Sequence, residues 1–118
     1  MNNQIKTQLD IDSEKFKENS FKFLELLNEY EKEQKEIELG GGPVNIQKQH
    51  DKGRMTARER VDCLIDDNSL FFELGLYAAY DMYKEVGKIN SAGLITGVGK
   101  IEDKDCMIIA NDATVKAG

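Results

Sequence analysis

The chain has 118 residues and a formal net charge of −6, with 40% hydrophobic and 32% charged residues. This length suits one small domain or part of a larger one, and the acidic balance argues against nucleic acid as a general partner. The longest apolar run is far shorter than the ~20 residues that cross a bilayer. Residues 1–15 lack the pattern of a secretory signal or a transit peptide, so we expect a cytoplasmic protein with no membrane partner.

The cysteines and the histidine do not follow a metal-binding pattern. Cys63, Cys106 and His50, the single histidine, stand far apart in the sequence, and none has a zinc-ligand spacing. We expect two reduced, partly buried thiols and no metal. A cysteine–histidine nucleophile pair would lack a third group to orient it.

The first predicted element is one long helix over residues 13–39. Large apolar residues recur every seven positions along it, at Phe16, Phe23, Tyr30 and Ile37. Ser13 suits the helix start, and the glycines after residue 39 end the helix. We interpret residues 1–39 as a helical arm whose narrow apolar stripe lies either on a partner subunit or on its own chain.

A polar stretch and a short helix follow. Residues 44–55 show no strong period, which predicts an irregular linker. Thr56 and Glu59 have the spacing of a capping box, in which the threonine caps the helix and the glutamate reaches back. One helical face then carries the apolar residues Ala57, Val61, Leu64 and Ile65. Turn-forming residues 66–69 close this helix.

Three short apolar segments are predicted strands: residues 70–74, 93–101 and 106–112. Four polar residues, 102–105, separate the last two, which predicts an antiparallel hairpin with a four-residue loop. Gly97 and Gly99 mark a bulge or a close approach to the backbone. Residues 76–91, with tyrosines at every third position from 77 to 83, fit a helical turn or an aromatic-rich loop.

The last predicted strand is apolar on both faces. Cys106-Met107-Ile108-Ile109-Ala110 offers large or small apolar side chains to either side, which is typical of a central, covered strand. One hairpin and two helices cannot bury such a sheet well. We therefore expect the chain to be an incomplete part of a larger fold.

Three stretches of the chain share one family's order and spacing over about residues 40–118. The first is Gly40-Gly41-Gly42 with Ile46-Gln47-Lys48-Gln49-His50. The second is Gly53-Arg54-Met55-Thr56-Ala57-Arg58-Glu59-Arg60-Val61-Asp62, continuing to Leu64, Asp66, Ser69 and Glu73. The third is Gly93-Leu94-Ile95-Thr96-Gly97-Val98-Gly99 with Cys106-Met107-Ile108-Ile109-Ala110-Asn111-Asp112-Ala113-Thr114-Val115-Lys116. Together they resemble the amino-terminal region of carboxyltransferase (β) subunits of biotin-dependent acyl-CoA carboxylases. The last stretch is most similar to methylcrotonyl-CoA carboxylase β subunits, with Ala117 in place of the usual glycine.

The resemblance implies an α/β fold: the amino-terminal part of a crotonase-like (ClpP/crotonase) domain with a long N-terminal helix, a short helix and a β-hairpin. Residues 40–118 would be the incomplete start of that domain. The family's oxyanion glycines, and most of its CoA and biotin pockets, would lie beyond residue 118. We therefore expect these residues alone to contain no catalytic residue and to be inactive.

The resemblance also implies an activity and partners. The family moves CO₂ from carboxybiotin to an acyl-CoA, and 3-methylcrotonyl-CoA is the favoured substrate here. Propionyl-, acetyl- or geranyl-CoA carboxylases and acyl-CoA decarboxylases are the alternatives. Implied partners are a biotin carboxylase and biotin carrier subunit, which holds the biotin, further carboxyltransferase subunits, and the coenzyme A thioester. The alternative of another class is a non-catalytic helical interaction module built on residues 13–39.

The best candidate site is the basic segment of residues 48–60, which holds five basic and two acidic side chains. A short basic segment in an acidic chain indicates a discrete anion, and arginine binds phosphate through bidentate hydrogen bonds. We expect Lys52, Arg54 and Arg58 to contact CoA phosphates, with Arg58 at the positive end of the short helix. The alternative is that Arg54, Arg58 and Arg60 pair with Glu59, Asp62 or acidic groups of the missing part of the chain.

Other polar residues have structural interpretations. We expect His50 to be a surface residue rather than a base. Asp112, like Lys116, follows a strand, where sites often form, but we expect it to cap or anchor the next loop. The tyrosines of residues 76–91 are expected to pack, in this chain or at a subunit contact.

Overall fold

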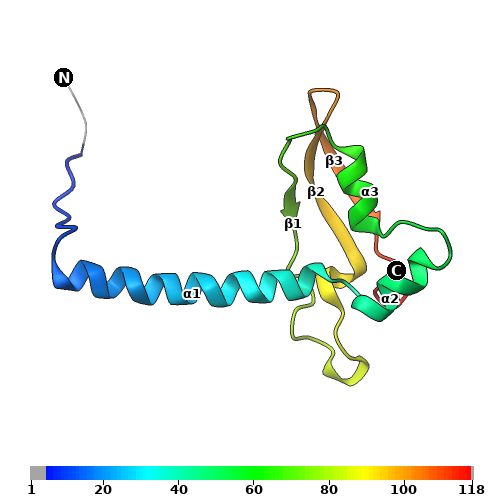
Figure 1. Ribbon diagram of the computed structural model, residues 1–118, viewed down its shortest axis with the longest axis horizontal. Helices are drawn as coiled ribbons and strands as arrows, with labels where there is room; N and C mark the ends of the chain where they lie inside the picture. The colour runs from blue at the N-terminus through cyan, green and yellow to red at the C-terminus, as the bar shows by residue number, and fades with distance from the viewer. Residues whose placement is uncertain (1–4, 118) are drawn as a thin grey trace. The chain divides into compact units, whose positions relative to one another are not determined.

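The computed structural model describes residues 5–117 of the chain. Its elements run α1 Glu14–Glu38, α2 Pro43–His50, α3 Ala57–Leu64, β1 Phe72–Leu74, η1 Lys84–Val86, η2 Asn90–Gly93, β2 Leu94–Ile101 and β3 Lys104–Asn111 (Figure 1). The chain divides into two compact units, Met1–Glu33 and Gln34–Gly118. Because this division falls inside α1, the assignment of residues 1–39 to an arm stays a prediction. Among the described residues, no helix is long and apolar enough to span a membrane.

The long helix α1 begins and ends as its sequence predicts. The Oγ of Ser13 accepts the backbone N–H of Phe16 at 3.3 Å, which satisfies one free donor of the first turn. At the other end Gly40 adopts a φ of 55°, and its N–H donates to the carbonyl of Ile37 at 2.9 Å. Ile37 is buried in the second unit. Phe16 is half-buried, and the other large apolar side chains of the helix within the first unit are exposed: Phe21, Phe23, Leu24, Leu26, Leu27 and Tyr30.

The predicted irregular linker over residues 44–55 is wrong in its first half, because α2 occupies Pro43–His50. Gly42 takes the N-cap position, and its carbonyl accepts the N–H of Asn45 at 3.1 Å and of Ile46 at 3.0 Å. Proline at the first helical position has the φ that a helix needs. Hydrophobic periodicity in the sequence does not reveal this helix, because none of its side chains is buried.

The short helix α3 carries the core of the second unit. The capping box is confirmed: the Oγ1 of Thr56 accepts the N–H of Glu59 at 3.2 Å, and Oε2 of Glu59 accepts the N–H of Thr56 at 2.7 Å. The core cluster is Ala57, Val61, Ile95 and Ile108, with Ile65, Phe71, Ile101 and Ala110 packed against it. The predicted apolar face is therefore confirmed for Ala57, Val61 and Ile65 and wrong for Leu64, which is exposed.

The three strands form one antiparallel sheet in the order β1-β2-β3, with Glu73, Gly97 and Ile108 side by side. The predicted close approach at the strand glycines is confirmed. A Cβ atom on Gly97 would lie 2.5 Å from the carbonyl oxygen of Phe72 and 2.5 Å from the ring of Phe71. A Cβ atom on Gly99 would lie 2.7 Å from the side chain of Ile65.

The predicted four-residue hairpin loop is wrong, because β2 and β3 pair up to Ile101 and Lys104 and leave a two-residue turn. Its residues Glu102 and Asp103 have φ values of 51° and 62°. The carboxylate of Asp66 accepts the backbone N–H groups of both, each at 2.8 Å. These two charge-assisted hydrogen bonds stabilise a left-handed turn that aspartate tolerates but glutamate does not favour.

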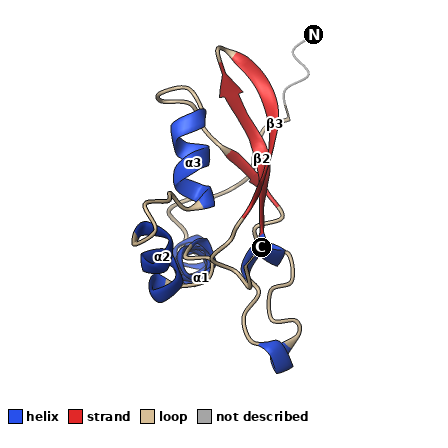
Figure 2. Ribbon diagram, turned by 90° about the vertical axis from the view of Figure 1, so that its right-hand side faces the viewer, coloured by secondary structure: helices blue, strands red, loops and turns tan. Residues whose placement is uncertain are grey.

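The two faces of the sheet differ in cover. Helix α3 packs against β2 and β3 on one face (Figure 2). The register places the other large apolar side chains on the opposite face, where they are exposed: Phe72, Leu74, Leu94, Met107 and Ile109. Within the described residues β3 pairs with β2 alone, as expected of an incomplete part of a larger fold, and a central, covered β3 stays a prediction for that fold. A continuous apolar run such as residues 106–110 requires cover on both faces, and within the described residues α3 supplies it on one.

Candidate anion-binding site

The basic segment of residues 48–60 lies beside an open pocket of about 470 Å³. One wall comes from the connection between α2 and α3 and the first turn of α3, and the other from the residues that follow β3. The lining residues are Gln49, Gly53, Arg54, Met55, Thr56, Ala57, Arg60, Asn111, Asp112, Ala113 and Thr114. The pocket thus joins all three stretches that carry the family pattern.

Arg54 and Arg60 enter this pocket from fixed backbone positions. The N–H of Arg54 donates to the carbonyl of Gln49 at 3.0 Å, just after a turn in which Gly53 has a φ of 66°. The N–H of Arg60 donates to the carbonyl of Thr56 at 3.1 Å, in the first turn of α3. Neither side chain forms an ion pair or hydrogen bond within residues 5–117. Two free guanidinium groups therefore border one cavity.

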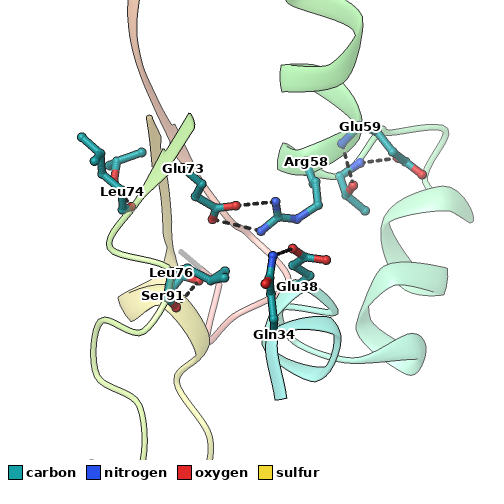
Figure 3. Close-up of polar contacts among 10 residues, drawn as sticks. Gln34, Glu38, Arg58, Glu59, Glu73, Leu74, Leu76 and Ser91 are labelled. Carbon is teal, nitrogen blue, oxygen red and sulfur yellow. Dashed lines mark hydrogen bonds and ion pairs between the residues drawn. The ribbon is translucent and has the colours of Figure 1, made fainter. Parts of the chain in front are cut away.

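Arg58 takes a different direction from the same helix. Its Nη1 and Nη2 donate to the two carboxylate oxygens of Glu73 on β1 at 2.7 and 3.1 Å (Figure 3). Burial opposes the charge of the guanidinium, but the hydrogen bond and the charge of Glu73 outweigh it and raise the pKa of Arg58 above its ordinary value. The carboxylate of Glu38 adds to this effect. Arg58 therefore joins α3 to the sheet.

The three predicted contact residues thus lie in three environments. Arg54 lines the pocket, Arg58 pairs with Glu73, and Lys52 is exposed and does not line the cavity. Contact of these residues with CoA phosphates stays a prediction. The alternative, that these arginines pair with carboxylates, holds for Arg58, but its partner is Glu73 and not the predicted Glu59, Asp62 or a group outside the chain.

Sequence reasoning missed Arg60 and Glu73. The signal for Arg60 was available, because Thr56 and Arg60 are four residues apart and share one side of the first helical turn. The signal for Glu73 was its position as a lone charge in the apolar segment 70–74. A charge that is buried in such a segment requires a partner.

The loop after β3 is held by a buried polar network. Asp112 Oδ1 accepts the N–H of Thr114 at 2.9 Å and its hydroxyl at 2.6 Å. The same Thr114 Oγ1 accepts the N–H of Gly41 at 2.9 Å, and the carbonyl of Gly40 accepts the side-chain amide of Asn90 at 2.8 Å. The prediction that Asp112 anchors the next loop is confirmed. A Cβ atom on Gly41 would collide with the carbonyl of Thr114, so this position requires glycine.

His50 lies on the surface, as predicted. Its Nε2 lies 2.9 Å from Oε1 of Glu59, the capping-box glutamate. The N–H of Thr56, and secondly the hydrogen bond with His50, lower the pKa of Glu59 below its ordinary value. The predicted partly buried thiols are correct for Cys106 and wrong for Cys63, which is exposed because it lies on the outer side of α3.

The remaining candidate groups form no reactive cluster. The rings of Tyr77 and Tyr80 pack edge to face with centroids 5.2 Å apart, in accord with a packing role. Within residues 5–117, no group of three or more histidine, cysteine, aspartate or glutamate side chains is arranged to hold a metal ion. Lys116 is exposed.

Comparison with known proteins gives the family. Residues 48–118 match the model of the carboxyl transferase domain. The chain is 35% identical to the probable mitochondrial methylcrotonoyl-CoA carboxylase beta chain of Drosophila melanogaster over 98% of its own length and 20% of that protein. The chain therefore belongs to the carboxyl transferase domain family, and it spans about a fifth of the length of this relative.

Solved structures agree with this assignment. The beta subunit of geranyl-CoA carboxylase from P. aeruginosa matches with a TM-score of 0.79 and 25% identity, over 97% of this chain and 21% of that one. Transcarboxylase 12S, solved as a hexamer assembly with methylmalonyl-coenzyme A bound, matches with a TM-score of 0.70 and 30% identity, over 77% of this chain and 18% of that one. The expected crotonase-like carboxyltransferase fold is confirmed.

Proposed function

We propose that this chain is part of the carboxyltransferase (β) subunit of a biotin-dependent acyl-CoA carboxylase. The observation that carries the proposal is the family match over residues 48–118, the segment that forms α3, the sheet and the pocket with Arg54 and Arg60. The subunit exchanges a proton on the acyl-CoA for the carboxyl group that carboxybiotin supplies. Because the chain spans about a fifth of the matched relative, the reaction requires residues outside it.

The proposed substrate is 3-methylcrotonyl-CoA. The similarity to a methylcrotonoyl-CoA carboxylase beta chain, over nearly the whole of this chain, supports it. Geranyl-CoA is the main alternative, because the geranyl-CoA carboxylase beta subunit matches over 97% of this chain. The remaining alternatives are propionyl-CoA or acetyl-CoA as the substrate, or a decarboxylase activity.

The proposed partners are a biotin carboxylase and biotin carrier subunit and further copies of the carboxyltransferase subunit. The hexamer of transcarboxylase 12S supports self-assembly. The exposed apolar side chains of α1 in the first unit, among them Phe23 and Leu27, supply a surface that a partner protein would cover. The same surface favours the alternative function, a helical interaction module.

The basic segment is proposed to contact the phosphates of coenzyme A. Lys52 and Arg54 are exposed and free to do so, whereas Arg58 would first have to release Glu73. This ordering makes Arg54 the strongest member of the predicted set Lys52, Arg54 and Arg58.

The proposed location is the cytoplasm, with the mitochondrion as the alternative that the name of the Drosophila relative gives. The two free cysteines suit a reducing compartment of either kind. Fractionation of cells that carry a tagged copy separates the two, and a signal in the mitochondrial fraction would refute the cytoplasmic assignment.

The activity test uses the full-length protein that contains these residues, mixed with its biotin carboxylase and carrier partner. The measurement is ATP-dependent incorporation of labelled bicarbonate into 3-methylcrotonyl-, geranyl-, propionyl- and acetyl-CoA. We expect the highest kcat/KM with 3-methylcrotonyl-CoA. A higher value with another acyl-CoA refutes the substrate, and no incorporation into any of them refutes the activity.

A further inference from the structure

We infer that Arg54 and Arg60 form the two sides of a binding site for a phosphate or diphosphate group of a small organic molecule, in the pocket between the α2–α3 connection and the loop after β3. The inference deepens the proposed function, because coenzyme A carries such groups, and it replaces Arg58 by Arg60 as the partner of Arg54. It rests on a cavity, two free cations and the neutral groups between them.

The geometry provides the first argument. Arg54 precedes the N-cap residue Thr56 by two positions and Arg60 follows it by four, and both side chains line the pocket of about 470 Å³. Hydrogen bonds from each backbone N–H hold both Cα positions. Two guanidinium forks on fixed backbone can bind different oxygens of one tetrahedral anion, or of two linked ones.

The electrostatics provide the second argument. Arg58 is paired with Glu73, and the carboxylate of Glu59 accepts the N–H of Thr56 and lies within hydrogen-bond distance of His50. Arg54 and Arg60 have no such partner within residues 5–117. The net −6 chain thus keeps two positive charges unpaired at one cavity. An anion of matching charge is the complement of such a pair.

One carboxylate in the wall, that of Asp112, opposes the binding of an anion. Asp112 is 9% exposed, and its Oδ1 accepts two hydrogen bonds from Thr114. Its other oxygen lies against Gly40. The carboxylate is therefore held in the loop network and is not presented to the cavity as a free acceptor, and the two guanidinium groups outnumber its single charge.

The neutral lining indicates an organic phosphate rather than a bare ion. Gln49 and Asn111 are among the residues that line the pocket, and their side-chain amides form no hydrogen bond within the described residues. Met55 and Ala113 supply apolar surface beside them. Amides can bind the polar edge of a base or an amide-bearing chain, while the apolar pair packs against the remainder.

The experiment measures anion affinity of the purified full-length protein by isothermal titration calorimetry. The probes are inorganic pyrophosphate, adenosine 3′,5′-bisphosphate, and pantetheine, which has no phosphate. We expect Arg54→Gln and Arg60→Gln each to weaken both phosphate probes by about tenfold or more, the effect of one lost charge-assisted contact. Tighter binding of adenosine 3′,5′-bisphosphate than of pyrophosphate would support an organic ligand. Tighter binding of pyrophosphate would refute the inference that the ligand is an organic phosphate.

The matched control is Lys104→Gln, which removes one exposed positive charge at the hairpin turn away from the pocket. Arg54→Lys and Arg60→Lys keep the charge and lose the fork, so they should retain part of the affinity. Unchanged affinity in both glutamine variants, or an equal loss in Lys104→Gln, would overturn the inference.

The outcomes separate this site from the proposed activity. Carboxylation with an unchanged KM for acyl-CoA in Arg54→Gln and Arg60→Gln would overturn the site and leave the activity standing. Loss of pyrophosphate affinity in these variants, in a protein that carboxylates no acyl-CoA, would support the site and overturn the activity.

Discussion

The ion pair between Arg58 and Glu73 gives the sharpest stability prediction. Glu73→Gln removes the charge but keeps the shape, and it leaves the guanidinium with one acceptor in place of two. The paired side chains are 28% and 12% exposed, between the fully buried pairs that cost about 3–5 kcal/mol to break and the exposed pairs worth about 0–1 kcal/mol. We therefore expect a loss of about 2 kcal/mol in the free energy of unfolding.

The size of the loss follows from what the arginine can do without its partner. Its Nε is already buried without a hydrogen-bond partner, so loss of a carboxylate leaves a second unsatisfied donor in a partly dry site. Partial exposure lets the freed Nη reach water, which keeps the cost below that of a fully buried charge. For a chain of this length about 2 kcal/mol lowers Tm by roughly 8 °C.

The assay is urea unfolding followed by circular dichroism, with Lys100→Gln as control. Lys100 pairs with Asp105 at an exposed site, so its loss should leave the urea midpoint close to that of the wild type. The double variant Arg58→Met with Glu73→Leu should cost less than Glu73→Gln, because no unpaired charge remains. A Glu73→Gln protein within about 0.5 kcal/mol of the wild type would refute the reasoning.

Three further predictions concern the loop network, the strand glycines and the capping box. Thr114→Val should cost about 1–3 kcal/mol, because it removes a buried hydroxyl that both donates and accepts, while Thr114→Ser should cost less; equal urea midpoints for the two variants would contradict this. Gly97→Ala should destabilise by about 1–3 kcal/mol, because the new methyl meets the backbone of Phe72 at 2.5 Å, and an unchanged melting curve would show that β1 can move aside. The stability from Glu59 should be fully present above its ordinary pKa of 4.5 and be lost as the pH falls through its lowered folded-state pKa. Glu59→Gln should therefore flatten the pH dependence of the urea midpoint in that range. A variant whose urea midpoint varies with pH in parallel with that of the wild type would contradict this prediction.

Local signals predicted the elements that depend on neighbours in the sequence. The cap at Ser13, the capping box at Thr56 and Glu59, and the glycine stop after α1 each involve groups within four residues. Their hydrogen bonds form as soon as the helix does, so residue type and spacing suffice to recognise them. The α2 helix was missed for the complementary reason: it starts from backbone geometry at Gly42 and Pro43 and has no buried face to reveal its period.

Contacts between distant segments escaped prediction. The two-residue turn at Glu102 depends on Asp66, 36 residues earlier, and the pair of Arg58 with Glu73 bridges 15 residues. Hydrophobic pattern and propensity indicate which residues are buried or need a partner. They do not indicate which partner lies close to each residue in the folded chain. Arg58 was therefore expected at the anion site, and Arg60 was not considered for it.

By itself the sequence determined the family, the helix boundaries set by caps and glycines, the antiparallel hairpin, and the presence of a basic segment in an acidic chain. The tertiary structure decided the direction of each arginine, the turn length and the cover of the sheet. The physical reason is the separation in sequence between the interacting residues. Caps and turns are made by residues a few positions apart, whereas ion pairs, cavities and strand order require distant segments to meet in space. The segments α3, β1 and the loop after β3 meet only in the folded chain.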